Sequence, residues 1–74
     1  MSAQRKRSVT IRGHRTSFSL EDAFFAELRD MAARRRLALA ALIAEVDAGR
    51  RPDDVNLSSA LRLSILRDLQ SRAG

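Results

Sequence analysis

The 74-residue sequence contains no cysteine and a single histidine, His14. These absences exclude disulfides, thiolate metal sites and histidine-rich metal sites. Hydrophobic residues make up 45% of the chain, which is too high a share for a disordered protein. A folded chain this short buries little apolar surface, and small domains compensate with disulfides, metals or oligomerisation. Oligomerisation is the option that this composition leaves.

Long apolar runs and glycine-rich loops are missing as well. The start, MSAQRKRSVT, is basic but no apolar stretch follows it, so we expect no secretory signal, no membrane span and a cytoplasmic protein. One histidine without cysteine offers no nucleophile–base pair, and no glycine-rich phosphate loop is present. We therefore expect no enzyme activity, no cofactor and no metal.

The positive charge, by contrast, is concentrated at one end. Residues 21–74 contain nine arginines and nine acids, so the net charge of +5 lies within residues 1–20. A basic arm beside a polar strand indicates a polyanionic partner, whereas a solvated tail is the plainer interpretation. The five cations are Arg5, Lys6, Arg7, Arg12 and Arg15.

Residues 14–20, HRTSFSL, alternate in the manner of a short strand. Phe18 and Leu20 point to one face; Arg15, Ser17 and Ser19 point to the other. Residues 8–13, SVTIRG, also alternate, but their apolar residues are odd-numbered and those of HRTSFSL are even-numbered. One flat strand cannot bury both sets, and Gly13 between them could form a bulge or a turn.

Three helices are predicted after the strand, over residues 21–35, 37–49 and 56–72. Apolar residues recur in each at helical spacing. Asp30 and Arg34 form a favourable pair four residues apart, Gly49 suits a left-handed cap, and Asn56 or Ser58 caps the third helix. Pro52 marks a loop before that helix. Leu63 and Leu66 lie off the apolar stripe of the third helix, so it should touch two neighbours, the second of which could be another subunit.

A lone short strand would leave its backbone groups unpaired. The economical partner is the same strand of a second copy, which gives an antiparallel homodimeric ribbon. Such a ribbon fits the major groove of double-stranded DNA, where arginine can bond guanine in bidentate fashion and serine can read either kind of base edge. We expect the base contacts to be Arg15, Ser17 and Ser19.

These features resemble a ribbon-helix-helix DNA-binding protein of the Arc/MetJ/CopG type. The stretch RTSFSLEDAFFAELRDMAARRRLALAALIAEV, residues 15–46, matches the strand, first helix, turn and second helix of that family without gaps. The flanks KRSVTIRGHRTS and NLSSALR resemble a bacterial subfamily of small stand-alone members. The resemblance implies an intertwined dimer whose ribbon enters the major groove and whose second helix begins at the phosphate backbone.

The predicted fold class is therefore mostly α with one short β-strand, a ribbon-helix-helix homodimer with an extra C-terminal helix. Residues 1–13 would be a basic arm, residues 14–49 the core, and residues 50–74 a loop and a helix packed on the dimer. The dimer core is expected to contain Phe18, Leu20, Phe24, Leu28, Leu42, Ile43 and Val46. The DNA backbone contacts are expected to be Arg5, Lys6, Arg7, Arg36, Ala38, Leu39 and Ala40.

Two residues depart from the family pattern. Arg36 stands where the turn between the helices usually has glycine, so the turn could be reshaped at a cost of roughly 1–2 kcal/mol. Ala38 replaces the usual serine or threonine cap of the second helix, which removes a side chain from the phosphate clamp. Arg36 could compensate by contacting a phosphate itself.

Several alternatives stay open from the sequence. Ser19 and Asp22 fit a capping box instead of a base contact. If residues 8–12 formed the ribbon, Ser8, Thr10 and Arg12 would be the readers. The leading function is a sequence-specific transcription regulator, a repressor. The alternatives are an antitoxin that binds a protein partner and an interaction module that keeps the dimer fold, with a partner on the C-terminal helix.

Overall fold

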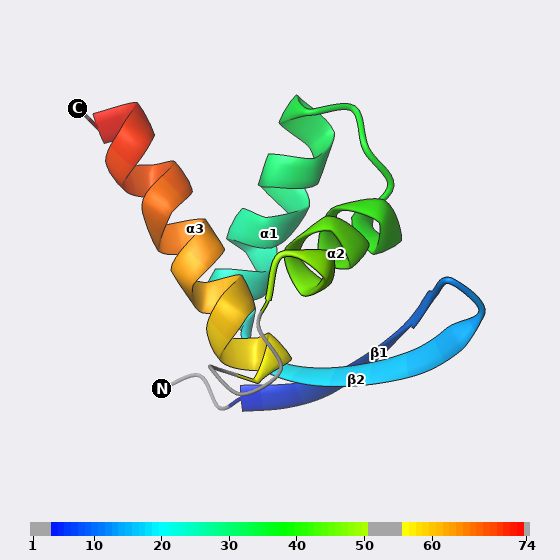
Figure 1. Cartoon of the computed structure of the whole chain (residues 1–74). Helices are drawn as coiled ribbons and strands as arrows, with labels where there is room; N and C mark the ends of the chain where they lie inside the picture. Colours follow the sequence, from blue (N-terminus) through cyan, green and yellow to red (C-terminus); the bar gives the residue numbers. More distant parts are fainter. Residues whose placement is uncertain (1–3, 51–55, 74) are drawn as a thin grey trace.

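The computed structural model describes residues 4–50 and 56–73 and contains two strands followed by three helices (Figure 1). Strand β1 spans Gln4–Ile11 and strand β2 spans His14–Glu21. The helices are α1, Asp22–Arg34, α2, Leu39–Ala48, and α3, Leu57–Ala73. The ribbon lies along one side of the three helices, as Figure 1 shows. The fold class is confirmed as mostly helical with a two-stranded antiparallel ribbon.

One part of that expectation is corrected: the chain contributes two strands, and β2 pairs with β1 of the same chain. Ile11 lies opposite His14, so only Arg12 and Gly13 form the turn. Their φ angles of 51° and 79° are the positive pair that a type I′ hairpin turn requires. The backbone groups of β2 on this edge are therefore hydrogen-bonded by β1, without a strand from a second copy. Dimerisation stays a prediction.

The hairpin also resolves the conflict between odd and even apolar positions. Paired residues of an antiparallel ribbon point to the same face. Arg7 pairs with Phe18 and Val9 with Thr16, so odd positions of β1 share a face with even positions of β2. This inner face packs on the helices through Ile11, Phe18 and Leu20, which are all buried.

Helices α1 and α2 form within two residues of their predicted ends. Asp30 and Arg34 pair as expected, with a Nε–Oδ2 distance of 2.8 Å. Gly49 does end α2, but its φ of −85° is right-handed, so the predicted left-handed cap is wrong. A right-handed residue suffices here because the Gly49 N–H still reaches the Glu45 carbonyl oxygen at 3.2 Å.

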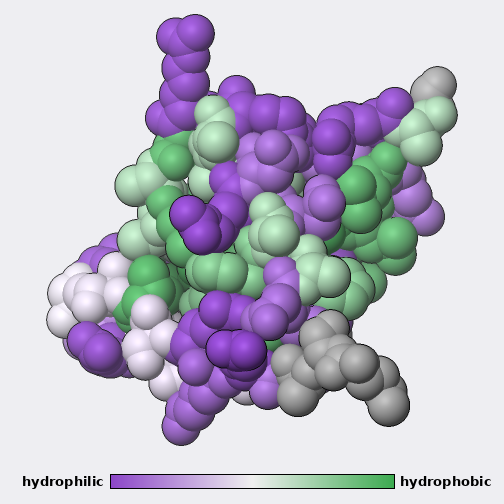
Figure 2. Space-filling model, turned by 180° about the vertical axis from the view of Figure 1, so that it is seen from behind, coloured by the Kyte–Doolittle hydropathy of each residue, from purple (hydrophilic) through white to green (hydrophobic). Residues whose placement is uncertain are grey.

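Helix α3 packs across α1, α2 and β2. The Asn56 side chain accepts a hydrogen bond from the Ser59 N–H at 2.9 Å, which confirms Asn56 as its cap. Leu57, Leu61 and Ile65 are buried. Hydrophobic surface lies along α3 in Figure 2. Three leucines of this helix, Leu63, Leu66 and Leu69, are 41%, 47% and 38% exposed.

The buried side chains of ribbon and helices form a single core within one chain. Five residues predicted for a dimer core lie in it, and the other two, Phe24 and Val46, pack against it half-buried. Residues 4–11 of the predicted arm form β1. Residues 1–3 and the predicted loop around Pro52 fall outside the described residues. Among the described helices none is long and apolar enough to span a membrane.

Candidate nucleic-acid interface

The outer face of the ribbon is a continuous polar surface that points away from the helices. The register places Thr10 opposite Arg15, Ser8 opposite Ser17, and Lys6 opposite Ser19. Five of these six side chains are exposed and Ser19 is half-buried. Pale, weakly polar surface lies over the turn end of the ribbon at the left of Figure 2. The face offers hydroxyl donors and acceptors between two cations.

The structure brings the three predicted base readers together on β2. Arg15 and Ser17 are exposed on the outer face, nearer the turn than Ser19. Arg15 forms no ion pair within the part of the chain that the structure describes. All the N–H donors of a guanidinium without a carboxylate partner remain available to a planar acceptor such as a guanine edge.

Ser19 joins the ribbon to α3. Its backbone N–H donates to Ser58 Oγ at 2.8 Å, and its carbonyl oxygen accepts from Arg62 at 3.3 Å. The capping box of Ser19 with Asp22 is not formed, because Glu21 is the cap residue of α1 and has no side-chain cap hydrogen bond. The sequence does not predict these contacts, since a hydroxyl 39 residues away leaves no local signal.

Glu21 lies at the open end of the outer face, where its negative charge is neutralised. Its pKa is lowered from 4.5, first by a backbone hydrogen bond and then by Gln4 and Arg62. The side-chain nitrogens of Gln4 and Arg62 each lie 3.4 Å from a Glu21 carboxylate oxygen. The carboxylate therefore stays ionised but paired, which limits its repulsion of a polyanion.

The inner face of β1 contains Arg5 and Arg7, which were both predicted to contact the DNA backbone. Both approach Asp22, with nitrogen–oxygen distances of 3.2 and 2.8 Å. The Arg7 guanidinium also sits 3.8 Å above the ring of Phe25, and its side chain is only 21% exposed. Arg7 thus acts as a packing residue through a cation–π contact. Arg5 remains 68% exposed.

Lys6 is the arm cation that the structure places on the outer face. Its side chain is exposed and has no ion pair among the described residues. Lys6 was predicted to contact the DNA backbone, but its position opposite Ser19 was not predicted. Two alternating runs separated by Arg12 and Gly13 could have revealed this pairing as a two-residue hairpin.

The residues predicted as alternative base readers lie at two different places on the ribbon. Ser8 and Thr10 lie on the outer face, beside Ser17 and Arg15. Arg12 lies in the turn, where its guanidinium is 3.2 Å from an Asp47 carboxylate oxygen at the end of α2. That ion pair fastens the turn to the helices.

The turn between α1 and α2 retains the left-handed geometry that glycine usually provides. Arg36 has a φ of 56°. Its N–H bonds the Ala33 carbonyl at 3.1 Å, and the Leu37 N–H bonds the Ala32 carbonyl at 2.9 Å. These two bonds form a Schellman motif, so the turn is not reshaped. The exposed Arg36 side chain has no ion pair within the described chain.

The N-terminus of α2 has no side-chain cap. Ala38 is the cap residue, and α2 has no side-chain cap hydrogen bond. The first N–H groups of a helix lack intrahelical partners and carry the positive end of its dipole. Ala38 is exposed and Leu39 and Ala40 are half-buried, so this end can meet an anion such as a phosphate.

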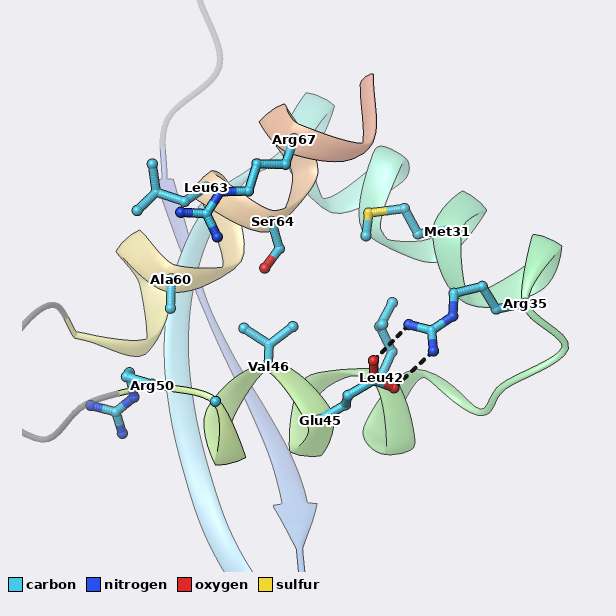
Figure 3. Close-up of a pocket in the computed structure, with 11 residues that line it drawn as sticks. Met31, Arg35, Leu42, Glu45, Val46, Arg50, Ala60, Leu63, Ser64 and Arg67 are labelled. Atoms are coloured by element: carbon cyan, nitrogen blue, oxygen red, sulfur yellow. Dashed lines mark hydrogen bonds and ion pairs between the residues drawn. The ribbon is translucent and has the colours of Figure 1, made fainter. Parts of the chain in front are cut away.

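A second surface feature lies between the helices, away from the ribbon's outer face. A hollow of about 580 Å³ is lined by residues of all three helices, among them Met31, Val46 and Leu63. Figure 3 shows Arg35 and Glu45 joined at its edge, with nitrogen–oxygen distances of 3.0 Å. The described residues contain no cluster of three or more potential metal ligands.

Comparison with known proteins adds one finding. Residues 4–69 match the model of a protein family described as the ribbon-helix-helix domain. No curated protein and no solved structure matches the chain significantly. The family match includes both strands, α1, α2 and most of α3.

Proposed function

The chain belongs to the ribbon-helix-helix domain family, whose members generally bind DNA as transcription regulators or antitoxins, and we propose that it is a sequence-specific transcriptional repressor. The outer face of the ribbon enters the major groove, which admits a two-stranded β-ribbon. The observation that carries this proposal is the exposed Arg15 beside Ser17, on a face where the described residues give Arg15 no ion pair and leave no acid unpaired. A DNA regulator of this kind works in the cytoplasm.

Base reading is assigned to β2. Arg15 bonds a guanine edge, Ser17 bonds a neighbouring base, and Ser19 reaches the next position from the α3 side. A bidentate arginine–guanine pair discriminates against other bases by roughly 1–3 kcal/mol. Ser19 contributes least, because it is half-buried beside α3.

Phosphate contacts are assigned to three elements: β1, the turn between α1 and α2, and the start of α2. Lys6 and Arg36 supply charge, and the first amides of α2, from Ala38 to Ala40, supply hydrogen bonds. Arg5 joins them only if it exchanges Asp22 for a phosphate, which its 68% exposure permits. Arg7 is no longer proposed as a phosphate contact, because it is held between Asp22 and Phe25.

The protein is proposed to act as a homodimer on double-stranded DNA. Family members typically bind DNA as dimers. The exposed leucines of α3 support a second copy as the neighbour of this helix, because burying their remaining exposed portions stabilises an interface by a part of the roughly 1.5–3 kcal/mol that full burial of a leucine contributes. Each copy then contributes its own ribbon.

The test is selection of random-sequence DNA by the purified protein near physiological salt, in parallel with Arg15→Ala. The proposal expects a short enriched motif that is lost in Arg15→Ala. Arg29→Ala is the matched control, because Arg29 is an exposed cation on α1 without an ion pair in the described residues. Failure to enrich any motif, with equal recovery by all three proteins, contradicts the proposal.

The hollow between the helices favours a second candidate function, an interaction module or antitoxin that binds a protein partner. The apolar side chains of its lining and the exposed leucines of α3 support it. It differs from the repressor in one measurable respect. An interaction module predicts that Arg15→Ala changes no DNA affinity, and that a partner protein co-purifies through α3.

A further inference from the structure

Every proposed reading position on β2 has a polar neighbour on β1. Thr10 lies opposite Arg15, Ser8 opposite Ser17, and Lys6 opposite Ser19. Directly opposed side chains of an antiparallel pair have Cβ atoms about 4.5–5.5 Å apart on the same face. If the β2 residues of these pairs face the DNA, the β1 residues opposite them therefore face it too.

The chemistry of the two rows is matched. Ser8 and Thr10 carry hydroxyl groups that can donate and accept, and both are exposed. Alternate positions of β1 behave differently: Arg7 packs on Phe25, and Ile11 is buried. The outer row of β1 is exposed along its length and faces the same way as Arg15, whereas the one exposed inner residue among those described, Arg5, is paired with Asp22.

We propose that β1 is a second base-reading strand, in which Ser8 and Thr10 contact base edges while Lys6 holds a phosphate at the open end of the ribbon. This inference rests on the proposed function of β2. Successive base pairs are about 3.4 Å apart along a DNA strand. The cross-strand spacing therefore brings Thr10 to the base pair that Arg15 reads or to the next one.

A hairpin from one chain also differs in symmetry from a ribbon made of two identical strands. Two identical antiparallel strands present the same side chains in both directions and match a palindrome. Here one direction presents Arg15, Ser17 and Ser19, and the other presents Lys6, Ser8 and Thr10. The sequence read by one ribbon is therefore not palindromic, and any palindrome arises from a second chain.

The experiment compares two chemically identical substitutions on opposite faces of the ribbon. Thr10→Val removes an outer hydroxyl, and Thr16→Val removes one from the inner face, where Thr16 pairs with Val9. Valine keeps the β-branched shape that favours strands. Each protein, with the wild type, Arg15→Ala and Ser8→Ala, selects random-sequence DNA, and competition binding then measures affinity for the wild-type motif.

The proposal expects Thr10→Val and Ser8→Ala each to lose about three- to tenfold of discrimination, the effect of one hydrogen bond. The affected bases are expected beside those that Arg15→Ala affects, while Thr16→Val selects the wild-type motif. An unchanged motif and affinity in both β1 variants, together with a changed motif in Arg15→Ala, would overturn the β1 inference and leave the proposed function standing. A wild type that enriches no motif overturns both. Either β1 variant alone decides the outcome if the other fails to fold.

Discussion

The backbone conformation of Arg36 lowers the stability of the fold, whereas its side chain is proposed to strengthen DNA binding. Its φ of 56° places a β-carbon in the left-handed region, which costs roughly 1–2 kcal/mol for a residue other than glycine. We expect Arg36→Gly to raise the free energy of unfolding by about 1 kcal/mol, measured as a higher urea midpoint. A lower midpoint would show that the side chain stabilises the folded chain.

The same variant should weaken DNA binding if Arg36 holds a phosphate. Removing one such contact lowers the slope of log affinity against log salt by roughly 1. Arg36→Asn is the control, because asparagine tolerates the left-handed region and carries no charge. Both variants should lose affinity together; binding equal to the wild type at every salt concentration would remove Arg36 from the interface.

Asp68 makes stability depend on acid pH. Arg34 donates to its carboxylate at 2.7 Å and, with help from Arg72, holds the pKa of Asp68 below its ordinary 3.8. A carboxyl whose pKa is lower in the folded state stabilises the fold above its unfolded pKa, and this stabilisation disappears as pH falls through the folded value. We expect Asp68→Asn to lower the urea midpoint at pH 7 and to differ progressively less from the wild type below about pH 4. A difference that stays constant down to pH 2.5 would contradict this role.

At the scale of elements, the hairpin depends on its two-residue turn. Gly13 has a φ of +79°, which an alanine adopts only with strain, although a β-carbon would meet no atom within 4 Å. Gly13→Ala is therefore expected to destabilise the ribbon by about 1–2 kcal/mol and to weaken DNA binding. Urea unfolding and binding titrations measure the two effects.

Gly49→Ala is the matched control for that prediction. Gly49 has a φ of −85°, and a β-carbon there would lie 3.8 Å from the nearest backbone oxygens, an ordinary contact. The variant should be neutral or more stable by about 0.4–1 kcal/mol, because alanine restricts the unfolded chain. Equal losses in both variants would mean that glycine is needed for something other than its backbone conformation.

The helices were predictable from sequence because their signals are local. Apolar spacing located α1, α2 and α3, and the Asn56 cap lies directly before α3. The pairing of β2 was not found, because Arg12–Gly13 is not one of the usual Asn-Gly or Asp-Gly hairpin turns and its significance depends on the register of both strands. The sequence alone predicts a single strand, whereas Val9 and Ile11 lie in a second strand that pairs with it as a hairpin.

Across the whole molecule, the N-terminal cations are divided between the inner face, the turn and the outer face of the ribbon. Among the five N-terminal cations, Arg5, Arg7 and Arg12 are paired with Asp22 or Asp47. Lys6 and Arg15 remain unpaired within the described chain, and both point outward. Composition predicted the excess of charge, but the choice between faces depends on acids from α1 and α2 that only the fold brings to the ribbon.

The exposed leucines of α3 bear on the number of chains in the functional molecule. We expect a dimer in sedimentation equilibrium at micromolar concentration, and a monomer for Leu66→Lys, because Leu66 is 47% exposed on α3. A charge placed in an apolar interface is costly to desolvate. Circular dichroism should remain unchanged, since the wild-type side chain lies outside the core of one chain. A Leu66→Lys dimer of wild-type stability would exclude this face of α3 as the interface.

Reading of base edges in the major groove by the polar outer face of the ribbon is the proposal on which the function depends. Methylation interference on the selected DNA tests it most directly, because N7-methylguanine alters the major groove and N3-methyladenine alters the minor groove. We expect N7 methylation of the guanine read by Arg15 to abolish binding, whereas N3 methylation of nearby adenines should leave binding intact. Binding that tolerates N7 methylation throughout the site, but is lost on N3 methylation, would place the protein in the minor groove and rule out base reading by this face in the major groove.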